Sequence, residues 1–140
     1  MPEFILDRGT AESARTFTSL DDFTKGYIEA LFFTETSEEL EDASFADLAP
    51  SALAEIMADC AAFQSKAADL LNLAYERDYD ATQAGRDFWF TRNGHGVGFW
   101  DRKPLEEDGL GDRLSKLCGW RTEWQEVNPC FGDDGLVYHN

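Results

Sequence analysis

Apolar residues recur at helical spacing near the start of the chain. Phe23, Tyr27 and Leu31 follow one another at intervals of four residues. Ser19 stands just before this run, with an acidic residue three positions later, which is the spacing of a helix N-cap. The pattern predicts a helix over about 20–34.

A second, longer apolar pattern begins after Pro50, a residue that is favoured in the first turn of a helix. Its members alternate in steps of three and four: Leu53, Ile56, Cys60, Phe63, Ala67, Leu70 and Ala74. This stripe predicts an amphipathic helix over about 50–76. We expect it to pack on the core of its own domain, and pairing with a second subunit is the alternative.

The most specific segment of the chain is 87–102, which reads DFWFTRNGHGVGFWDR. It places five aromatic residues around Asn93-Gly94, and Asn-Gly is the strongest short-range signal for a β-hairpin with a type I′ turn. If Arg92 pairs with His95 across the turn, one side of the hairpin carries Phe88, Phe90, Val97 and Phe99. The other side then carries Trp89 and Trp100. The segment therefore predicts a hairpin with two aromatic faces.

The last third of the chain contains three shorter patterns. Leucines at positions 110, 114 and 117 predict a helix of about ten residues that ends at Gly119. The alternation in 124–127 predicts a strand, and Asp134-Gly135 predicts a second hairpin whose last strand is 136–138. The order of elements is then ααββαββ. This order predicts an α+β fold in which two to three helices cover an antiparallel sheet of about four strands.

The length of 140 residues is that of one domain, and its 43% hydrophobic content is sufficient for a core. The acidic N-terminus is unlike a signal peptide, and no apolar run approaches the length of a membrane span. Three cysteines occur without a Cys-x-x-Cys pair: Cys60, Cys118 and Cys130. These features predict a single cytoplasmic domain, residues 1–140, with free thiols and no membrane association.

Charge changes this picture most, because 28 acidic residues stand against 12 basic ones, a net charge of −16. The imbalance is concentrated in residues 1–60, where 14 acids and 3 bases leave −11. Such a domain repels phosphate backbones and anionic membranes, so direct binding to nucleic acid is disfavoured. Attraction to a basic protein surface, such as the DNA groove of another protein, is favoured. Solubility alone is the alternative explanation of the charge.

Candidate catalytic chemistry is limited to His95, which stands between two glycines near Arg92. Histidine is the usual general base near neutral pH, but no nucleophile or second histidine lies at motif spacing. The histidines and cysteines match no zinc template, and Asp133-Asp134-Gly135 lacks the other ligands of a calcium loop. The glycines of 94–98 are not followed by the lysine of a phosphate-binding loop. We therefore expect no cofactor and no metal.

Three segments carry a resemblance to a known group of proteins: 87–102, 110–114 (LGDRL) and 132–135 (GDDG). Together with the segment 26–35 (GYIEALFFTE), they resemble a family of small acidic proteins encoded on phages, prophages and plasmids of Proteobacteria. The resemblance implies an accessory role in the host cell, with activity against host defence as the natural expectation. It implies no catalytic residue.

Charge and resemblance together predict a non-enzymatic anti-defence protein, of anti-CRISPR or anti-restriction type. It would inhibit a host DNA-targeting complex by protein–protein binding, as an acidic mimic of nucleic acid in a basic groove. The residues expected to contact the partner are Glu35, Glu38, Glu39, Glu41, Asp42, Asp47, Trp89 and Trp100. The alternatives are a homodimeric adaptor that pairs through the helix at 50–76 and a small enzyme that uses His95.

Overall fold

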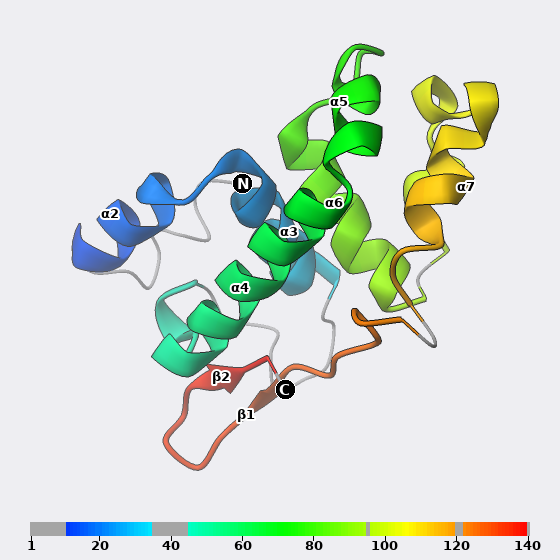
Figure 1. Ribbon diagram of the computed structural model, residues 1–140. Coiled ribbons are helices and arrows are strands. Elements are labelled where there is room, and N and C mark those ends of the chain that lie inside the picture. The colour runs from blue at the N-terminus through cyan, green and yellow to red at the C-terminus, as the bar shows by residue number, and fades with distance from the viewer. Residues whose placement is uncertain (1–10, 35–44, 95, 120–121, 140) are drawn as a thin grey trace.

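The computed structural model describes residues 11–34, 45–94, 96–119 and 122–139, and within them the chain is mostly helical (Figure 1). The α-helices are α2 (Ala11–Ser19), α3 (Asp22–Thr34), α4 (Pro50–Lys66), α5 (Ala68–Tyr75), α6 (Ala81–Arg92) and α7 (Leu110–Ser115). Single 3-10 turns are η1 (Phe45–Asp47), η2 (Phe99–Asp101), η3 (Lys103–Leu105) and η4 (Glu107–Gly109). The strands β1 (Cys130–Phe131) and β2 (Val137–Tyr138) complete the described chain.

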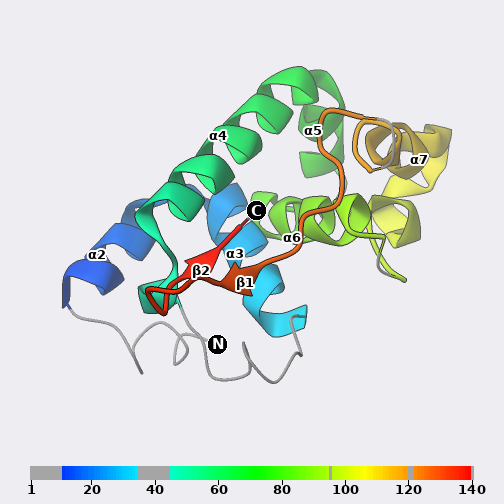
Figure 2. The same ribbon diagram turned by 90° about the horizontal axis from the view of Figure 1, so that it is seen from below.

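The predicted α+β fold with a four-stranded sheet is wrong. In the described residues the sheet consists of β1 and β2 alone, paired antiparallel. Helices pack on helices instead, and the hairpin lies against one end of α4, well away from α7 (Figure 2). The core of the protein is therefore a helix–helix interface, not a sheet covered on one face.

Both helices predicted in the first half of the chain are confirmed. The first is α3, although its cap is Asp21 rather than Ser19: the Asp21 carboxylate accepts a 2.8 Å hydrogen bond from the backbone N–H of Thr24. The second is interrupted at Ala67, whose φ of −96° and ψ of 13° separate α4 from α5. The apolar stripe continues through the break, since Phe63 and Leu71 on either side of it are both buried.

The predicted hairpin at 87–102 is wrong, because its first half is the helix α6. Asp80 begins this helix by accepting a 2.8 Å hydrogen bond from the backbone N–H of Gln83. Asn93 and Gly94 end it, with Gly94 at a φ of 68°. A type I′ turn and a helix C-terminus both need a residue of positive φ, so the Asn-Gly pair fits either structure.

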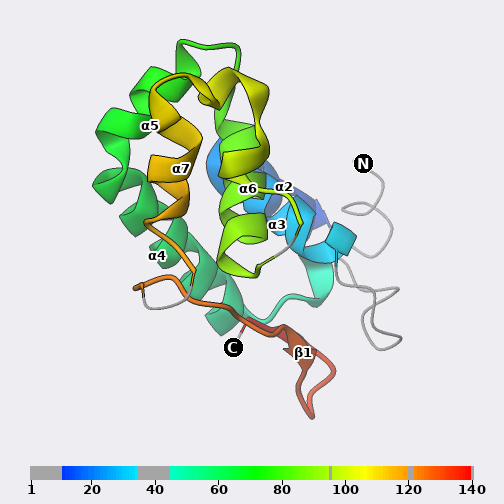
Figure 3. The ribbon, with the colours of Figure 1, turned by 90° about the vertical axis from the view of Figure 1, so that its right-hand side faces the viewer.

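The helices α3 and α6 run in the same direction, side by side, and touch at two glycines. A Cβ atom at Gly26 would overlap the carbonyl of Thr82, and one at Gly85 would overlap the carbonyl of Phe23. The backbones are in direct contact at this point. The N-terminal ends of the helices lie together, and their C-terminal ends point apart (Figure 3).

Aromatic side chains from separate helices fill the core. Phe63 of α4 stacks on Phe88 of α6 at 4.3 Å between ring centroids, and Trp124 meets both rings edge-on. Tyr27 of α3 contacts Phe88 and Trp89. Of the aromatic residues that suggested a hairpin, Phe88 and Trp89 thus lie on the inner face of α6, and Phe99 is buried in η2.

The C-terminal part is confirmed at two of the three predicted elements. The helix after position 109 is α7, although it has six residues and ends at Ser115 rather than at Gly119. The Asp-Gly hairpin is present, with Cys130 opposite Tyr138 and a turn that Gly135 closes at a φ of 81°. The strand predicted at 124–127 is wrong. That segment is irregular, and side chains at the end of α6 bond its backbone: Arg92 Nε donates to the Gln125 carbonyl and the Val127 N–H donates to Asn93.

Candidate functional site

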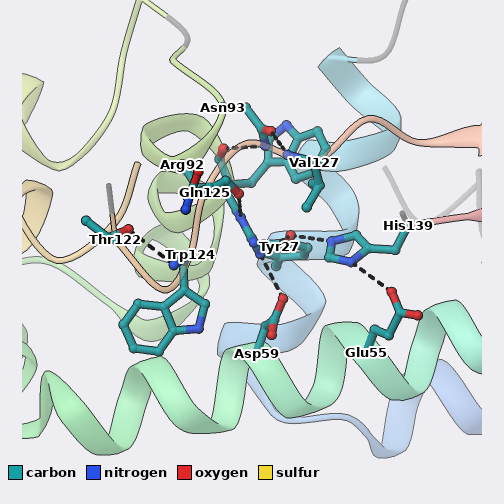
Figure 4. Close-up of polar contacts among 11 residues, drawn as sticks. Tyr27, Glu55, Asp59, Arg92, Asn93, Thr122, Trp124, Gln125, Val127 and His139 are labelled. Carbon is teal, nitrogen blue, oxygen red and sulfur yellow. Dashed lines mark hydrogen bonds and ion pairs between the residues drawn. The ribbon is translucent and has the colours of Figure 1, made fainter. Parts of the chain in front are cut away.

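Arg92 lies at the C-terminal end of α6 with its side chain almost completely buried. One guanidinium nitrogen, Nη1, donates to Asp59 Oδ2 at 3.0 Å and to the Tyr27 hydroxyl at 3.1 Å, and Nε donates to the Gln125 carbonyl at 2.9 Å. Figure 4 shows these groups converging from α3, α4 and the segment that follows α7. A buried charge is tolerated here because each of these bonds offsets its desolvation.

His139 extends this cluster on the other side of Tyr27. Its Nε2 lies 2.6 Å from the Tyr27 hydroxyl, and its Nδ1 lies 3.7 Å from a carboxylate oxygen of Glu55 (Figure 4). Because Arg92 is a pure donor, the tyrosine oxygen accepts from it and the tyrosine O–H donates to Nε2. The imidazole proton is thereby assigned to Nδ1, on the side of Glu55.

Titration of the cluster is suppressed by its burial. Desolvation, with the positive charge of Arg92, lowers the pKa of His139 to about 4, against an opposing effect of Asp59. Desolvation likewise raises the pKa of Tyr27 above its usual value. Near neutral pH the imidazole and the phenol are both uncharged and held by each other, an arrangement that stabilises the fold and provides no activated nucleophile.

A second buried ionic group is centred on Asp87 of α6, whose side chain is fully buried. Arg102 donates to both of its oxygens, at 2.6 to 3.0 Å, and the Tyr79 hydroxyl donates at 2.6 Å. Gln83 adds a fourth donor at 3.1 Å. The hydrogen bond to Asp87 raises the pKa of Arg102, and the contact attaches the segment after Gly98 to α6.

The outer surface is dominated by carboxylates. Of the 20 acidic side chains that the structure describes, 16 are exposed. Five of the ten described basic side chains are instead engaged in ion pairs with the protein's own acids: Lys66, Arg77, Arg86, Arg92 and Arg102. Each such pair neutralises one base and one acid, and the acids that remain outnumber the remaining bases on the described surface.

Part of this charge gathers where α3 and α6 begin. Asp21 and Asp80, the two N-caps, both act electrostatically on the hydroxyl of Tyr75, which places them around one side chain. Asp22 follows Asp21 directly, Asp78 lies two positions before Asp80, and both are exposed. We call these four residues the acidic end. Partial burial opposes ionisation of Asp21, but hydrogen bonds from Thr24 and Gln64 outweigh it and lower its pKa.

The residues predicted to contact a partner lie in different environments, and some lie outside the described residues. Glu35, Glu38, Glu39, Glu41 and Asp42 lie outside the described residues, as does His95. Asp47 is partly exposed in η1, and Trp100 in η2 is 47% exposed. Trp89 is 2% exposed, so its expected role as a surface anchor is inconsistent with its position in the core.

The two buried clusters were not anticipated from the sequence. Asp87 and Arg92 are charged residues inside an aromatic run, and on a helix such residues point into the core only when they are paired. That signal was present, but the hairpin interpretation placed Arg92 at an exposed turn. Nothing in the local sequence indicates that His139 would meet Tyr27.

Comparison with known proteins gives no relative. No protein-family model matches the chain, and the searches of curated proteins and of solved structures found no match. Among the described residues no cluster of His, Cys, Asp and Glu side chains could hold a metal ion. Across the same residues, every helix is too short or too polar to cross a membrane.

Proposed function

We propose that the protein is a non-enzymatic inhibitor that binds a basic protein surface through its carboxylates, in the place where that surface would hold nucleic acid. The observation that carries this proposal is the outward display of acids together with the internal pairing of bases. A nucleic-acid groove is lined by unpaired Lys and Arg, to which such a surface is complementary. If the resemblance expected from the sequence holds, the target belongs to the host defence complexes that act on DNA.

The contact is expected to use the acidic end and the acid-rich residues 35–42, with Trp100 as an exposed aromatic side chain at the surface. Tryptophan at an interface contributes a large contact area, and charged groups around it steer the encounter. Trp89 has no part in this contact because it belongs to the core.

A plating assay is the first test. Phage would be plated on hosts with and without each CRISPR or restriction system, in the presence and absence of the expressed protein. Loss of protection in a host that carries one such system is the expected result. Unchanged protection in every host would contradict the anti-defence role.

A binding assay then tests the mechanism on the affected complex. A first variant, Asp22→Asn, Glu76→Gln and Asp78→Asn, removes two of the four charges of the acidic end and that of its neighbour Glu76, and leaves the two caps unchanged. A second variant neutralises Glu35, Glu38 and Glu39. We expect both to weaken binding and to reduce its salt dependence, and duplex DNA to compete with the protein. The matched control neutralises three exposed acids of the C-terminal part of the chain, Glu123, Glu126 and Asp133. Binding that survives both variants and is insensitive to salt would exclude nucleic-acid mimicry.

A homodimeric adaptor is the second candidate, and one feature of α4 favours it. This helix exposes a face that has no charged residue: Ser51, Ala54, Met57, Ala58, Ala61, Ala62 and Ser65. Light scattering on the purified protein measures the mass directly. A monomer at the highest soluble concentration would exclude the adaptor, and a dimer that Ala61→Glu dissociates would support it.

A further inference from the structure

A hollow between α3 and α6 is lined differently from the rest of the surface. The helices touch at Gly26 and Gly85, and beyond this contact their C-terminal halves diverge (Figures 2 and 3). The hollow has a volume of about 360 Å³, within the range of small-molecule sites. Its lining consists of Glu29, Ala30, Phe33, Gln83, Arg86, Phe90 and Arg102.

The apolar part of the lining contains two aromatic rings. Phe33 of α3 is 75% exposed, more than any other large apolar side chain in the described chain. Phe90 of α6 is partly buried against the core and contributes a second ring. An exposed phenyl ring beside a hollow gains stability when a flat apolar group covers it.

The polar part of the lining presents guanidinium donors. Arg86 uses Nη2 for Glu29, at 2.9 Å, and Arg102 uses Nε and Nη2 for Asp87. The Nη1 group of each arginine has no hydrogen bond with the described residues. These ion pairs hold the two guanidinium groups in place, so their remaining donors are preorganised for an acceptor.

Hydrogen bonding, rather than excess charge, selects the kind of acceptor. The lining carries two arginines that are each paired with a carboxylate, Arg86 with Glu29 and Arg102 with the buried Asp87, so the hollow has no net positive charge. A ligand carboxylate would accept hydrogen bonds from the guanidinium donors that these pairs leave over. A polyanion would be repelled by the surrounding carboxylates, whereas a small ligand with one negative charge would lose little on approach.

From this combination we propose that the hollow binds a small aromatic monocarboxylate. The aromatic ring lies against Phe33 and Phe90, and the carboxylate accepts hydrogen bonds from Arg86 and Arg102. This site is separate from the acidic surface, and it goes beyond the proposed inhibitory function. Either proposal can fail without the other.

The test is a titration of the full-length ¹⁵N-labelled protein with 2-naphthoate, followed by ¹H–¹⁵N correlation spectra. Binding is expected to shift the amides of α3 and α6 that surround Phe33, Arg86 and Phe90. The neutral analogue 2-naphthamide has the same ring system and is expected to bind about tenfold more weakly or worse, because it lacks the charge that the guanidinium groups recognise.

Matched variants separate the site from general effects. Arg86→Gln and Phe33→Ser alter partly exposed and exposed side chains of the lining, and each is expected to weaken 2-naphthoate binding about tenfold or more. Lys66→Gln removes a base from another ion pair, and Leu73→Ser removes an exposed apolar side chain elsewhere; both should bind normally. The amide spectrum of each variant verifies that it is folded.

Four results of the titrations would overturn the proposal, and a fifth comes from the protein alone. The four are no saturable shifts with 2-naphthoate, shifts centred elsewhere, equal binding of 2-naphthamide, and equal weakening in the control variants. Shifts at the same amides on raising the protein concentration alone would assign the hollow to a second copy of the chain, and would also overturn it.

Discussion

Tyr27 connects three parts of the chain through a single hydroxyl group, which accepts from Arg92 and donates to His139. Removing that hydroxyl leaves a buried guanidinium and a buried imidazole each short of one partner. The cost of such an unsatisfied buried group exceeds the net gain from forming an exposed hydrogen bond.

The substitution Tyr27→Phe should therefore lower the free energy of unfolding by about 1–3 kcal/mol. Urea denaturation followed by tryptophan fluorescence measures it. Tyr138→Phe is the matched control, because its hydroxyl donates to the exposed Asp134 and its loss should change stability by less than about 0.5 kcal/mol. Equal effects of the two substitutions would show that the cluster adds nothing to stability.

His139 should make the stability of the protein dependent on pH. Burial and the charge of Arg92 lower its pKa from the ordinary 6.5 to about 4, so the unfolded chain takes up this proton at higher pH than the folded protein does. The contribution is fully present above pH 6.5 and is lost as the pH falls toward 4. Its total is about 3 kcal/mol, on the scale of 1.4 kcal/mol per pH unit.

The measurement compares urea denaturation of the wild type and of His139→Gln at about pH 7 and about pH 4.5. The wild type and the variant share the groups that face the imidazole, which are Tyr27, Arg92, Asp59 and Glu55. We expect the wild type to lose more stability than the variant between the two pH values. Parallel losses would mean that other groups cause the acid sensitivity.

At the scale of elements, the contact between α3 and α6 depends on two positions without a side chain. Alanine has a higher helix propensity than glycine by about 1 kcal/mol, so a substitution at Gly85 would stabilise an isolated helix. In the protein the added Cβ would overlap the carbonyl of Phe23, a backbone atom that cannot rotate away.

Gly85→Ala should consequently destabilise the protein by about 1–3 kcal/mol, with a sign opposite to that of helix propensity. Thermal or urea unfolding measures this. Gly96→Ala is the control, because nothing lies within 4 Å of its added Cβ atom. A Gly85→Ala protein as stable as the wild type would mean that the helices can separate without cost.

The elements also show where sequence patterns are sufficient. Long amphipathic repeats predicted α3 and the α4–α5 pair, and Asp134-Gly135 predicted the hairpin β1–β2. The segment 87–102 was misassigned because both structures place aromatic residues inside and both use a glycine of positive φ, here Gly94 at 68°. Asp80, which caps α6, was the local feature that favoured the helix.

At the scale of the whole molecule, the exposed carboxylates repel one another and favour the expanded, unfolded chain. Raising the ionic strength from about 0.01 M to about 0.15 M screens this repulsion, and the urea concentration at the unfolding midpoint should rise. Urea is suitable because it carries no charge. A midpoint that falls with salt would mean that the ion pairs, which salt weakens, outweigh the net repulsion.

The sequence by itself determined the acidity, the three helical segments with clear periodicity and the turn at Gly135, because each depends on residues that are close along the chain. Only the tertiary structure decided that Trp89 is buried and that Tyr27, Arg92 and His139 meet. The physical reason is that a hydrogen bond between residues 112 positions apart depends on how helices pack, and local periodicity contains no information about that packing.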